Sequence, residues 1–416
     1  VAFVLAYISC GVRCRRVVDL QGLRLERDLA AHDRHRQSDP LASLLLALSN
    51  ARSVITSRSS ALSSSSSSPR SSETLAPQMV ASGSRGALRA RFVGIGSAQP
   101  PTKVSNGQLE KLVETNDEWI VQRTGISSRN LLTPTETLSG LASTAAKNAL
   151  EHAGVAPEEV DLVILATSSP DDMFGDAAYV ASQIGAKNAF GFDLTAACSG
   201  FLFGVSTASQ FLHTGAYKTA VVVGADALSR WVDWKDRNTC VLFGDGAGAV
   251  VMKAAETDDA AGVLGYELHS DGTGRPSLGL SYSGKEEALA DVTSVTNGAY
   301  GCVEMNGKEV YKFATTRVPK VLKEALDNAG VKAEDVDWLV LHQANIRIME
   351  TVAKKLGIPM EKVITNLDET GNTSAGSIPL ALDAAVKSGK VKKGDLIAMS
   401  GFGAGLQWGA SIIRWG

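Results

Sequence analysis

Residues 149–165 read ALEHAGVAPEEVDLVIL, and residues 325–341 read ALDNAGVKAEDVDWLVL. In both segments a helical pattern ends at a glycine, a short acidic turn follows, and an apolar run of strand length completes the segment. This order of elements is half of a βαβ unit. Because the chain carries it twice, 325 − 149 = 176 residues apart, the sequence predicts a duplicated α/β fold.

The similarity continues beyond these two segments. Cys198 stands before an apolar helical pattern that ends near Gly215, and Asn372 stands before one that ends at Gly389. The separations agree, since 372 − 198 = 174 and 389 − 215 = 174. We therefore expect Cys198 and Asn372 to occupy matching helix N-termini. In a duplicated fold with a pseudo-twofold axis, such positions would converge on one site.

Composition limits the class of protein. The 416 residues are 44% hydrophobic and 20% charged, which fits one large or two medium globular domains. A net charge of −3 gives no general attraction to nucleic acid or to a membrane surface. The five cysteines form no CxxC pair and no Cys/His cluster, so we expect no metal site and no disulfide framework.

The first 90 residues differ from the rest. Residues 1–12 are apolar but too short to span a bilayer, and they lack the basic region and cleavage site of a signal peptide. Residues 41–91 are rich in Ser, Ala and Arg, with Glu73 as the only acidic residue. This composition predicts an organelle transit peptide over residues 1–90, with an ordinary disordered tail as the alternative. The folded enzyme would begin at Arg91.

Strand and helix patterns alternate after that point. Two similar halves, residues 91–265 and 266–416, with buried helices between two sheets, would form a five-layered α-β-α-β-α sandwich. The expected strands are residues 90–95, 162–167, 190–194, 220–224, 338–341, 396–400 and 410–415, and the expected helices include residues 138–153 and 200–213.

Cys198 is the candidate nucleophile. It follows a short strand and opens a buried helix, where unpaired amides and the helix dipole would lower the thiol pKa and favour the thiolate. Most lone cysteines are small buried hydrophobes, and that interpretation is kept for Cys240 and Cys302. Small neighbours, Ala196, Ala197 and Gly200, would leave room for a substrate at Cys198.

His342 and Asn372 are the candidate partners of Cys198. His342 follows the strand at residues 338–341, and the aligned residue in the first half is Ala166. A histidine gained at the carboxyl end of a strand lies where α/β folds bind ligands. Asn372 would be an ordinary helix N-cap were it not for its match to Cys198.

Two glycine-rich stretches have alternative interpretations. Residues 243–249, FGDGAGA, lack the Lys-Ser/Thr of a P-loop, so close backbone packing is the better explanation. Residues 401–405, GFGAG, predict a tight turn whose backbone amides could stabilise an oxyanion during acyl transfer.

Five segments together resemble β-ketoacyl-[acyl-carrier-protein] synthase III, a thiolase-fold condensing enzyme that starts type II fatty acid synthesis. The resemblance runs from about Arg91 to Gly416, and with the leader it resembles the plastid form from a plant, in the chloroplast stroma. The segments are EWIVQRTGI at 118–126, ACSG at 197–200, LHQAN at 341–345, GNTSA at 371–375 and GFGAG at 401–405.

The resemblance implies a reaction. Cys198 would take the acetyl group of acetyl-CoA as a thioester, and His342 and Asn372 would bind the malonyl thioester oxygen while carbon dioxide leaves. The enolate would attack the acetyl group to give 3-oxobutanoyl-carrier protein. Backbone amides of Cys198 and Ala404 would hold the oxyanion. The family usually has glycine where Ala404 stands, which matters little for a backbone donor. No cofactor is implied beyond the substrate.

The resemblance also implies binding residues. CoA adenine would stack between Trp119 and Arg237, with Arg123 near the phosphates and Asn345 beside them. Phe174 would reach across a homodimer into the acyl tunnel of the partner. Acyl carrier protein is acidic, and its candidate docking residues are Lys312, Arg347, Lys354 and Lys355, although such a run is usually a solvated helix face.

Four other functions remain to be weighed at this point. Type III polyketide synthases share the Cys-His-Asn set and use CoA thioesters, but residues 118–126 argue against them. Thiolases and elongating synthases replace the asparagine, so Asn372 argues against both. A non-catalytic scaffold that only binds acyl-CoA would not need a thiolate together with His342 and Asn372.

Overall fold

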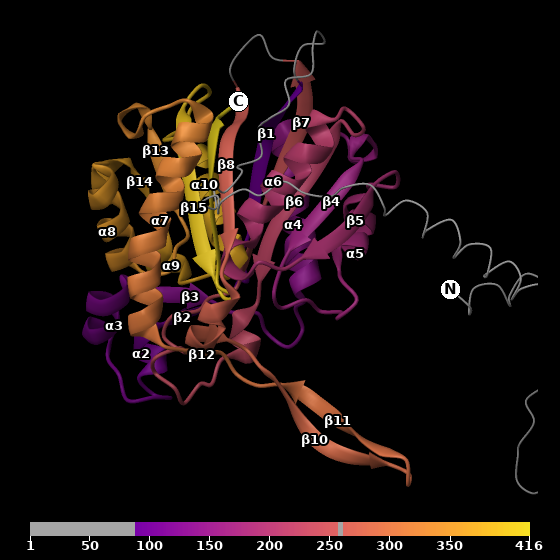
Figure 1. Ribbon diagram of the computed structural model, residues 1–416, viewed down its shortest axis with the longest axis vertical. Helices are drawn as coiled ribbons and strands as arrows, with labels where there is room; N and C mark the ends of the chain where they lie inside the picture. The colour runs from indigo at the N-terminus through magenta and orange to yellow at the C-terminus, as the bar shows by residue number, and fades with distance from the viewer. Residues whose placement is uncertain (1–87, 257–260) are drawn as a thin grey trace, which may run out of the picture. The chain divides into compact units, whose positions relative to one another are not determined.

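Figure 1 shows the computed structural model of the protein, which describes residues 88–256 and 261–416. The chain separates into two units, Val1–Ala81 and Ser82–Gly416, and the first lies outside the described residues. Almost all of the predicted leader, residues 1–90, therefore lies outside them as well. The first described strand, β1, begins at Leu88, close to the expected start of the folded part at Arg91.

The first of two large sheets has five strands. Its inner strands are almost fully buried, as the continuous apolar runs of the sequence predicted. β4 is parallel to β5 and β6, whereas β7 is antiparallel to β6 and β1. In spatial order the strands are β1 (Leu88–Ala98), β7 (Gly246–Glu256), β6 (Thr219–Asp226), β4 (Leu162–Ala166) and β5 (Phe190–Leu194).

The second large sheet repeats this topology. β13 is parallel to β14 and β15, whereas β16 is antiparallel to β15 and β8. Its spatial order is β14 (Val363–Ile364), β13 (Trp338–Leu341), β15 (Leu396–Gly403), β16 (Gln407–Arg414) and β8 (Gly262–Ser270). Strand for strand, this order and these directions match those of the first sheet. The duplication predicted from residues 149–165 and 325–341 is thereby confirmed, and the division expected at residue 265 falls inside β8.

Helices form the other three layers of the sandwich (Figure 1). Two of them cover the outer face of the first sheet, two cover the outer face of the second, and two lie between the sheets. The outer pairs are α4 (Leu138–Ala153) with α5 (Ala177–Ile184), and α7 (Gly307–Ala329) with α8 (Ile346–Leu356); the central pair is α6 (Gly200–His213) with α10 (Ser377–Lys387). The five expected layers are present.

Two helix ends explain why the repeated segments fold alike. Gly154 and Gly330 end α4 and α7 in the left-handed conformation, with φ of 61° and 68°. A side chain disfavours this conformation, so glycine is the residue that allows each chain to turn back toward its strand. Each glycine is followed by a short 3₁₀ turn, Pro157–Glu159 or Ala333–Asp335, before β4 or β13.

Smaller elements complete the fold. A two-stranded ribbon of β10 (Tyr282–Leu289) and β11 (Thr293–Tyr300), which the sequence analysis did not predict, projects from the body (Figure 1). The remaining elements are β2 (Lys103–Ser105), α2 (Asn106–Leu109), α3 (Asp117–Thr124), β3 (Ser128–Asn130), β9 (Leu278–Gly279), β12 (Glu304–Met305) and α9 (Leu367–Thr370). In the described part of the chain, no helix has the length and apolar character needed to cross a membrane.

The glycine run at residues 401–405 corrects one expectation. It is not wholly a turn, because Gly401, Phe402 and Gly403 continue β15 and pair with β16. The chain reverses only at residues 404–406. The absence of a side chain at Gly403 allows a close approach to the turn at Ala197–Ser199 instead.

Candidate active site

Two short turns meet at the centre of the molecule. The 3₁₀ turn Ala197–Ser199 leads into α6, and the 3₁₀ turn Ser374–Gly376 leads into α10. Ala197 and Ser374 both have positive φ, 46° and 50°, a conformation that is uncommon for residues other than glycine. The two turns are therefore equivalent in backbone, and each begins with the same local strain.

This equivalence corrects the register expected from sequence. The turns are 374 − 197 = 177 residues apart, whereas the glycines after the helices are 389 − 215 = 174 apart. The difference arises because α6 has 14 residues and α10 has 11. Cys198 therefore corresponds to Ala375, and Asn372 lies ahead of its turn rather than at the matching helix N-terminus.

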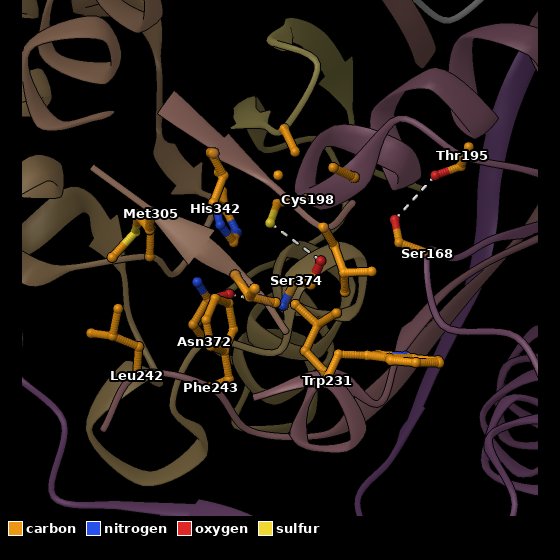
Figure 2. Close-up of a pocket in the computed structure, with 18 of the residues that line it drawn as sticks. Ser168, Thr195, Cys198, Trp231, Leu242, Phe243, Met305, His342, Asn372 and Ser374 are labelled. Carbon is orange, nitrogen blue, oxygen red and sulfur yellow. Dashed lines mark hydrogen bonds between the residues drawn. The ribbon is translucent and has the colours of Figure 1, made fainter. Parts of the chain in front are cut away.

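The expected convergence nevertheless occurs. Cys198, His342 and Asn372 line one pocket, and Figure 2 shows their side chains gathered at its base. Cys198 accepts a hydrogen bond at its Sγ from the Oγ of Ser374, at 3.2 Å. The Oδ1 of Asn372 accepts from the backbone nitrogen of Ser374, at 2.9 Å. Ser374, which the sequence analysis did not single out, thus joins the two predicted residues.

The backbone of Asn372 is held by the other half of the fold. Its nitrogen donates to the carbonyl of Leu242, and its own carbonyl accepts from the nitrogen of Gly244, at 2.9 and 3.0 Å. A side chain at Gly244 would clash, since its Cβ would lie 2.2 Å from the carbonyl oxygen of Thr370. Close backbone packing, as expected, is what the glycines of residues 243–249 allow here.

His342 is a buried neutral imidazole. It is 2% exposed, its Nδ1 lies 2.7 Å from the Oγ of Ser377, and its ring packs edge-on against Phe402 at 5.5 Å. Burial lowers the pKa of His342 to about 3, because the charged form would lose its hydration. At neutral pH the ring can hold a hydrogen bond without carrying charge.

Cys198 differs from expectation in its acidity. We expected a lowered thiol pKa at the helix N-terminus, but burial raises the pKa of Cys198 to about 12, and repulsion from Asp226 adds to this. The hydrogen bond from Ser374 acts in the opposite direction. The side chain is only 8% exposed, so desolvation outweighs the local amides. In the free protein the thiol is therefore protonated.

Strand β15 of the second half packs against the turn Ala197–Ser199, which we call the nucleophile turn after the role predicted for Cys198. An added Cβ at Gly403 would lie 2.6 Å from the nitrogen of Cys198 and 2.8 Å from the Cβ of Ala197. Only a glycine permits this approach of β15 to the turn. Ala404, the predicted second oxyanion donor, follows directly and lines the same pocket as Cys198.

The pocket extends from this base to the surface. Its volume is about 2270 Å³, and Trp119, Arg123, Arg237 and Asn345 all line it. The guanidinium carbons of Arg123 and Arg237 lie 4.5 and 5.3 Å from the ring centre of Trp119. The four residues predicted to bind CoA are therefore neighbours. Asn345 also caps α8 and donates to the carbonyl of Arg123, at 2.9 Å.

Phe174 lines the pocket at a different place. Its side chain is 99% exposed in the single chain, beside Met173 at 77%. Full exposure of a large apolar side chain is unfavourable in water, which agrees with a residue that another surface covers.

The four candidate docking residues, Lys312, Arg347, Lys354 and Lys355, are all exposed on α7 and α8, two helices that pack together. Arg347 lines the pocket and also donates to the carbonyl of Gln122, at 2.6 Å. Lys355 donates to the carbonyl of Thr315 at 2.9 Å and so has a structural contact. Lys308, which sequence reasoning missed, also lines the pocket. The part of the chain that the structure describes contains no cluster suited to a metal ion.

Comparison with known proteins decides the family. Residues 192–272 match the family model 3-oxoacyl-[acyl-carrier-protein (ACP)] synthase III, and residues 326–415 match the model of its C-terminal part. A curated β-ketoacyl-[acyl-carrier-protein] synthase III of Microcystis aeruginosa is 60% identical over 325 residues, which cover 78% of this chain and 97% of that protein. The chain belongs to the β-ketoacyl-[acyl-carrier-protein] synthase III family.

Solved structures of similar proteins agree with the fold. The chain has a TM-score of 0.70 and 43% identity to 3-oxoacyl-[acyl-carrier-protein] synthase III from Aquifex aeolicus, over 78% of this chain and 100% of that one. It has a TM-score of 0.72 and 36% identity to the priming β-ketosynthase of the R1128 polyketide pathway, over 80% and 99%. The predicted thiolase-like sandwich is confirmed.

Proposed function

We propose that this enzyme transfers an acetyl group from acetyl-CoA to Cys198 and condenses it with malonyl-[acyl-carrier protein], giving 3-oxobutanoyl-[acyl-carrier protein], CoA and carbon dioxide. This is the initiating condensation of type II fatty acid synthesis. The observation that carries the proposal is the meeting of Cys198, His342 and Asn372 in one pocket of a synthase III family member.

The first half-reaction uses the nucleophile turn. The sulfur of Cys198 attacks the thioester carbon, the carbonyl oxygen becomes an oxyanion, and collapse expels the CoA thiolate. The amides of Cys198 and Ala404 are the proposed oxyanion donors. Gly403 keeps this strand of the second half against the nucleophile turn, because no side chain separates them.

The second half-reaction uses His342 and Asn372. Both are proposed to donate hydrogen bonds to the malonyl thioester oxygen, His342 from Nε2 and Asn372 from its side-chain amide. Decarboxylation then leaves its electron pair on an enolate that these donors stabilise. The enolate carbon attacks the acetyl thioester and releases the sulfur of Cys198. A neutral imidazole suits this role, since burial lowers the pKa of His342 to about 3.

The pocket mouth fits a nucleotide thioester. We propose that CoA adenine stacks on Trp119 between it and Arg237, while Arg123 pairs with phosphate and Asn345 lines the wall. Arg123 and Arg237 both face the Trp119 ring already, so a ligand would insert into a formed cationic aromatic site.

Three further assignments complete the proposal. Carrier protein would dock on the exposed cations Lys312, Arg347, Lys354 and Lys355 of α7 and α8. The chain would form a homodimer in which Phe174 is covered by the partner, which agrees with its exposure of 99%. Residues 1–90 would direct the enzyme to the plastid stroma, an origin compatible with its cyanobacterial relatives.

Intact-protein mass spectrometry tests the proposed function. Incubation with acetyl-CoA is expected to add one acetyl group, and malonyl-carrier protein is then expected to remove it as 3-oxobutanoyl-carrier protein appears. Cys198→Ala should take no acetyl group, whereas Cys240→Ala, also at a buried cysteine, should take it. Discharge by malonyl-CoA alone would instead indicate a polyketide synthase, and CoA binding with no adduct would indicate a binding scaffold.

A further inference from the structure

The thiol of Cys198 must lose its proton during the acylation step. Burial raises the pKa of this thiol to about 12, so at pH 7 a thiol in free exchange with solvent would be ionised in only about one molecule in 10⁵. A neighbouring acceptor for the proton would remove this limit. Asp226, which ends β6 and which the sequence analysis did not identify, lies close to this thiol.

Asp226 is a fully buried carboxylate whose hydrogen-bond donors are hydroxyls and backbone amides. Its Oδ1 accepts from the first half of the fold: the Oγ1 of Thr167 at 3.1 Å, the nitrogen of Ser168 at 2.7 Å and the Oγ of Ser169 at 2.8 Å. Its Oδ2 accepts from the nitrogen of Ala375 at 3.2 Å, in the turn of the second half. The carboxylate therefore joins the segment after β4 to the turn before α10.

Ser374 stands between the carboxylate and the thiol. Its hydroxyl is 3.2 Å from the sulfur of Cys198, and the nitrogen of the next residue, Ala375, donates to Asp226. Hydrogen bonding from the Ser374 side chain also lowers the pKa of Asp226. One hydroxyl has one proton to donate, so the sulfur and the carboxylate compete for it. When Cys198 is a thiol, its proton can point to Ser374, which then donates to Asp226. When Cys198 is a thiolate, Ser374 donates to the sulfur and Asp226 holds the proton.

We propose that Asp226, acting through the hydroxyl of Ser374, accepts the thiol proton of Cys198 as the sulfur attacks the acyl donor. This proposal rests on the proposed function for its physiological donor. The thiol proton moves to Ser374 Oγ while the hydroxyl proton moves to Asp226, and the sulfur pair forms the bond to the thioester carbon. The departing CoA thiolate takes a proton from water. When condensation later expels the Cys198 thiolate, the proton on Asp226 returns along the same path.

The surrounding groups support this assignment. Burial raises the pKa of Asp226 above its ordinary value, although hydrogen bonds from Ser374, Ser168, Ser169 and Ala375 offset part of the effect. A carboxylate that is hard to keep ionised is a better proton acceptor. The contacts to Asp226 from β4 and from the Ser374 turn are hydroxyls and amides. His342 is a further titratable group that lines the same pocket as Cys198.

Alkylation of Cys198 by iodoacetamide tests the proposal without any acyl substrate. If Cys198 and Asp226 share one proton, the fraction present as thiolate and protonated carboxyl does not change with pH over a wide range. The rate constant should therefore be level between about pH 6.5 and 8.5, as followed by intact mass. An isolated thiol of high pKa would instead react about tenfold faster with each pH unit, and that slope in the native protein would overturn the proposal.

Variants identify the acceptor. Asp226→Asn and Ser374→Ala should each remove the pH-independent region of the alkylation rate and slow alkylation at pH 7 by at least about tenfold. Ser374→Thr keeps a hydroxyl and should therefore retain the native rate. Ser143→Ala is the control, since it removes a buried hydroxyl that donates to the carbonyl of Ser139 within α4, and its rate should stay within about twofold. Faster or unchanged alkylation in Asp226→Asn would mean that the carboxylate only repels the thiolate, and would overturn the proposal.

His342 is the competing acceptor, and His342→Ala separates the two. The level region should survive in this variant, and its loss would transfer the role to His342 and overturn the proposal. If circular dichroism shows that Asp226→Asn does not fold, the pH profiles of alkylation in the native protein, Ser374→Ala and His342→Ala still test the proposal. Failure of the proposed function has a separate signature, because the native protein would then alkylate at Cys198 but take no acetyl group from acetyl-CoA.

Discussion

The turn before α6 and the turn before α10 have the same backbone conformation and different side chains. Both begin with a residue of positive φ, Ala197 in one and Ser374 in the other, and both continue into a central helix. At the next position one has Cys198 and the other Ala375. A nucleophile stands on one side of the pseudo-twofold axis, and a hydroxyl stands opposite it at 3.2 Å. Duplication supplied matched geometry, and substitution gave the two turns different side chains.

The largest effect on the comparison of the two turns is expected when the side-chain amide of Asn372, in the second half, is removed. Asn372→Ala should reduce condensation by about 10²- to 10³-fold, because an oxyanion donor is lost, while acetylation of Cys198 continues. Single-turnover mass spectrometry measures the two steps separately. Asn328→Ala, at an exposed position on α7, is the control and should alter neither step. Loss of acetylation in Asn372→Ala would mean that Asn372 also serves the first step.

The contact between the halves can be tested at one glycine. Gly403→Ala places a Cβ 2.6 Å from the nitrogen of Cys198, so we expect it to lower the free energy of unfolding by about 1–3 kcal/mol and to slow acetylation. Gly401→Ala is matched in type and strand, but its nearest contact is 3.4 Å. It should fall closer to the native protein in urea unfolding and in acetylation rate. Equal effects would show that the nucleophile turn does not depend on this approach.

A smaller effect is expected at the pocket mouth, where both halves contribute to one binding site. Trp119→Ala should raise the KM for acetyl-CoA about tenfold, since a stacking surface for adenine is removed. The kcat should change little, because Trp119 lies far along the pocket from the reacting sulfur in the proposed pose. Acetyl-pantetheine, which has no adenine, is the matched substrate. A similar loss with acetyl-pantetheine would contradict the stacking assignment.

The free energy of unfolding should depend on pH through His342, which belongs to the second half. The pKa of His342 is about 3 when folded, whereas an unfolded histidine titrates near 6.5. Below pH 6.5 the unfolded chain therefore binds a proton that the folded chain excludes. The free energy of unfolding should fall by up to about 1.4 kcal/mol per pH unit as pH decreases from 6.5 toward 3. His342→Gln should reduce this slope in urea titrations, and an unchanged slope would place its cause elsewhere.

Much of the fold was predictable because local patterns and tertiary structure agree. α4, α6, β5 and β13 have the bounds that periodicity and glycine stops indicated. The repeat at 149–165 and 325–341 even predicted the matching sheets. The ribbon of β10 and β11 was missed, since its strands are exposed throughout and carry no buried face that would produce a regular apolar pattern.

The meeting of Cys198, His342 and Asn372 in one pocket was predictable, but their register and the acidity of the thiol were not. Counting from helix ends aligned Cys198 with Asn372, and a difference of three residues in helix length was invisible to that count. The expected low thiol pKa came from the helix dipole alone, whereas burial depends on packing from both halves. Ser374 and Asp226 carry no motif of their own, although Ser374 lay within the quoted segment GNTSA.

The equal strand order of the two sheets has an evolutionary consequence. Two identical copies of one half, associated about a true twofold axis, would make every contact twice, because residue i then contacts residue j and j contacts i. Such an ancestor could have the pairing of Cys198 with Ser374 only together with its symmetry mate, at the equivalent positions that Ala375 and Ala197 occupy here. Fusion into a single chain lifted that restriction, since each turn could then mutate alone. A single Cys–Ser pair is therefore possible only in a chain whose halves are encoded separately.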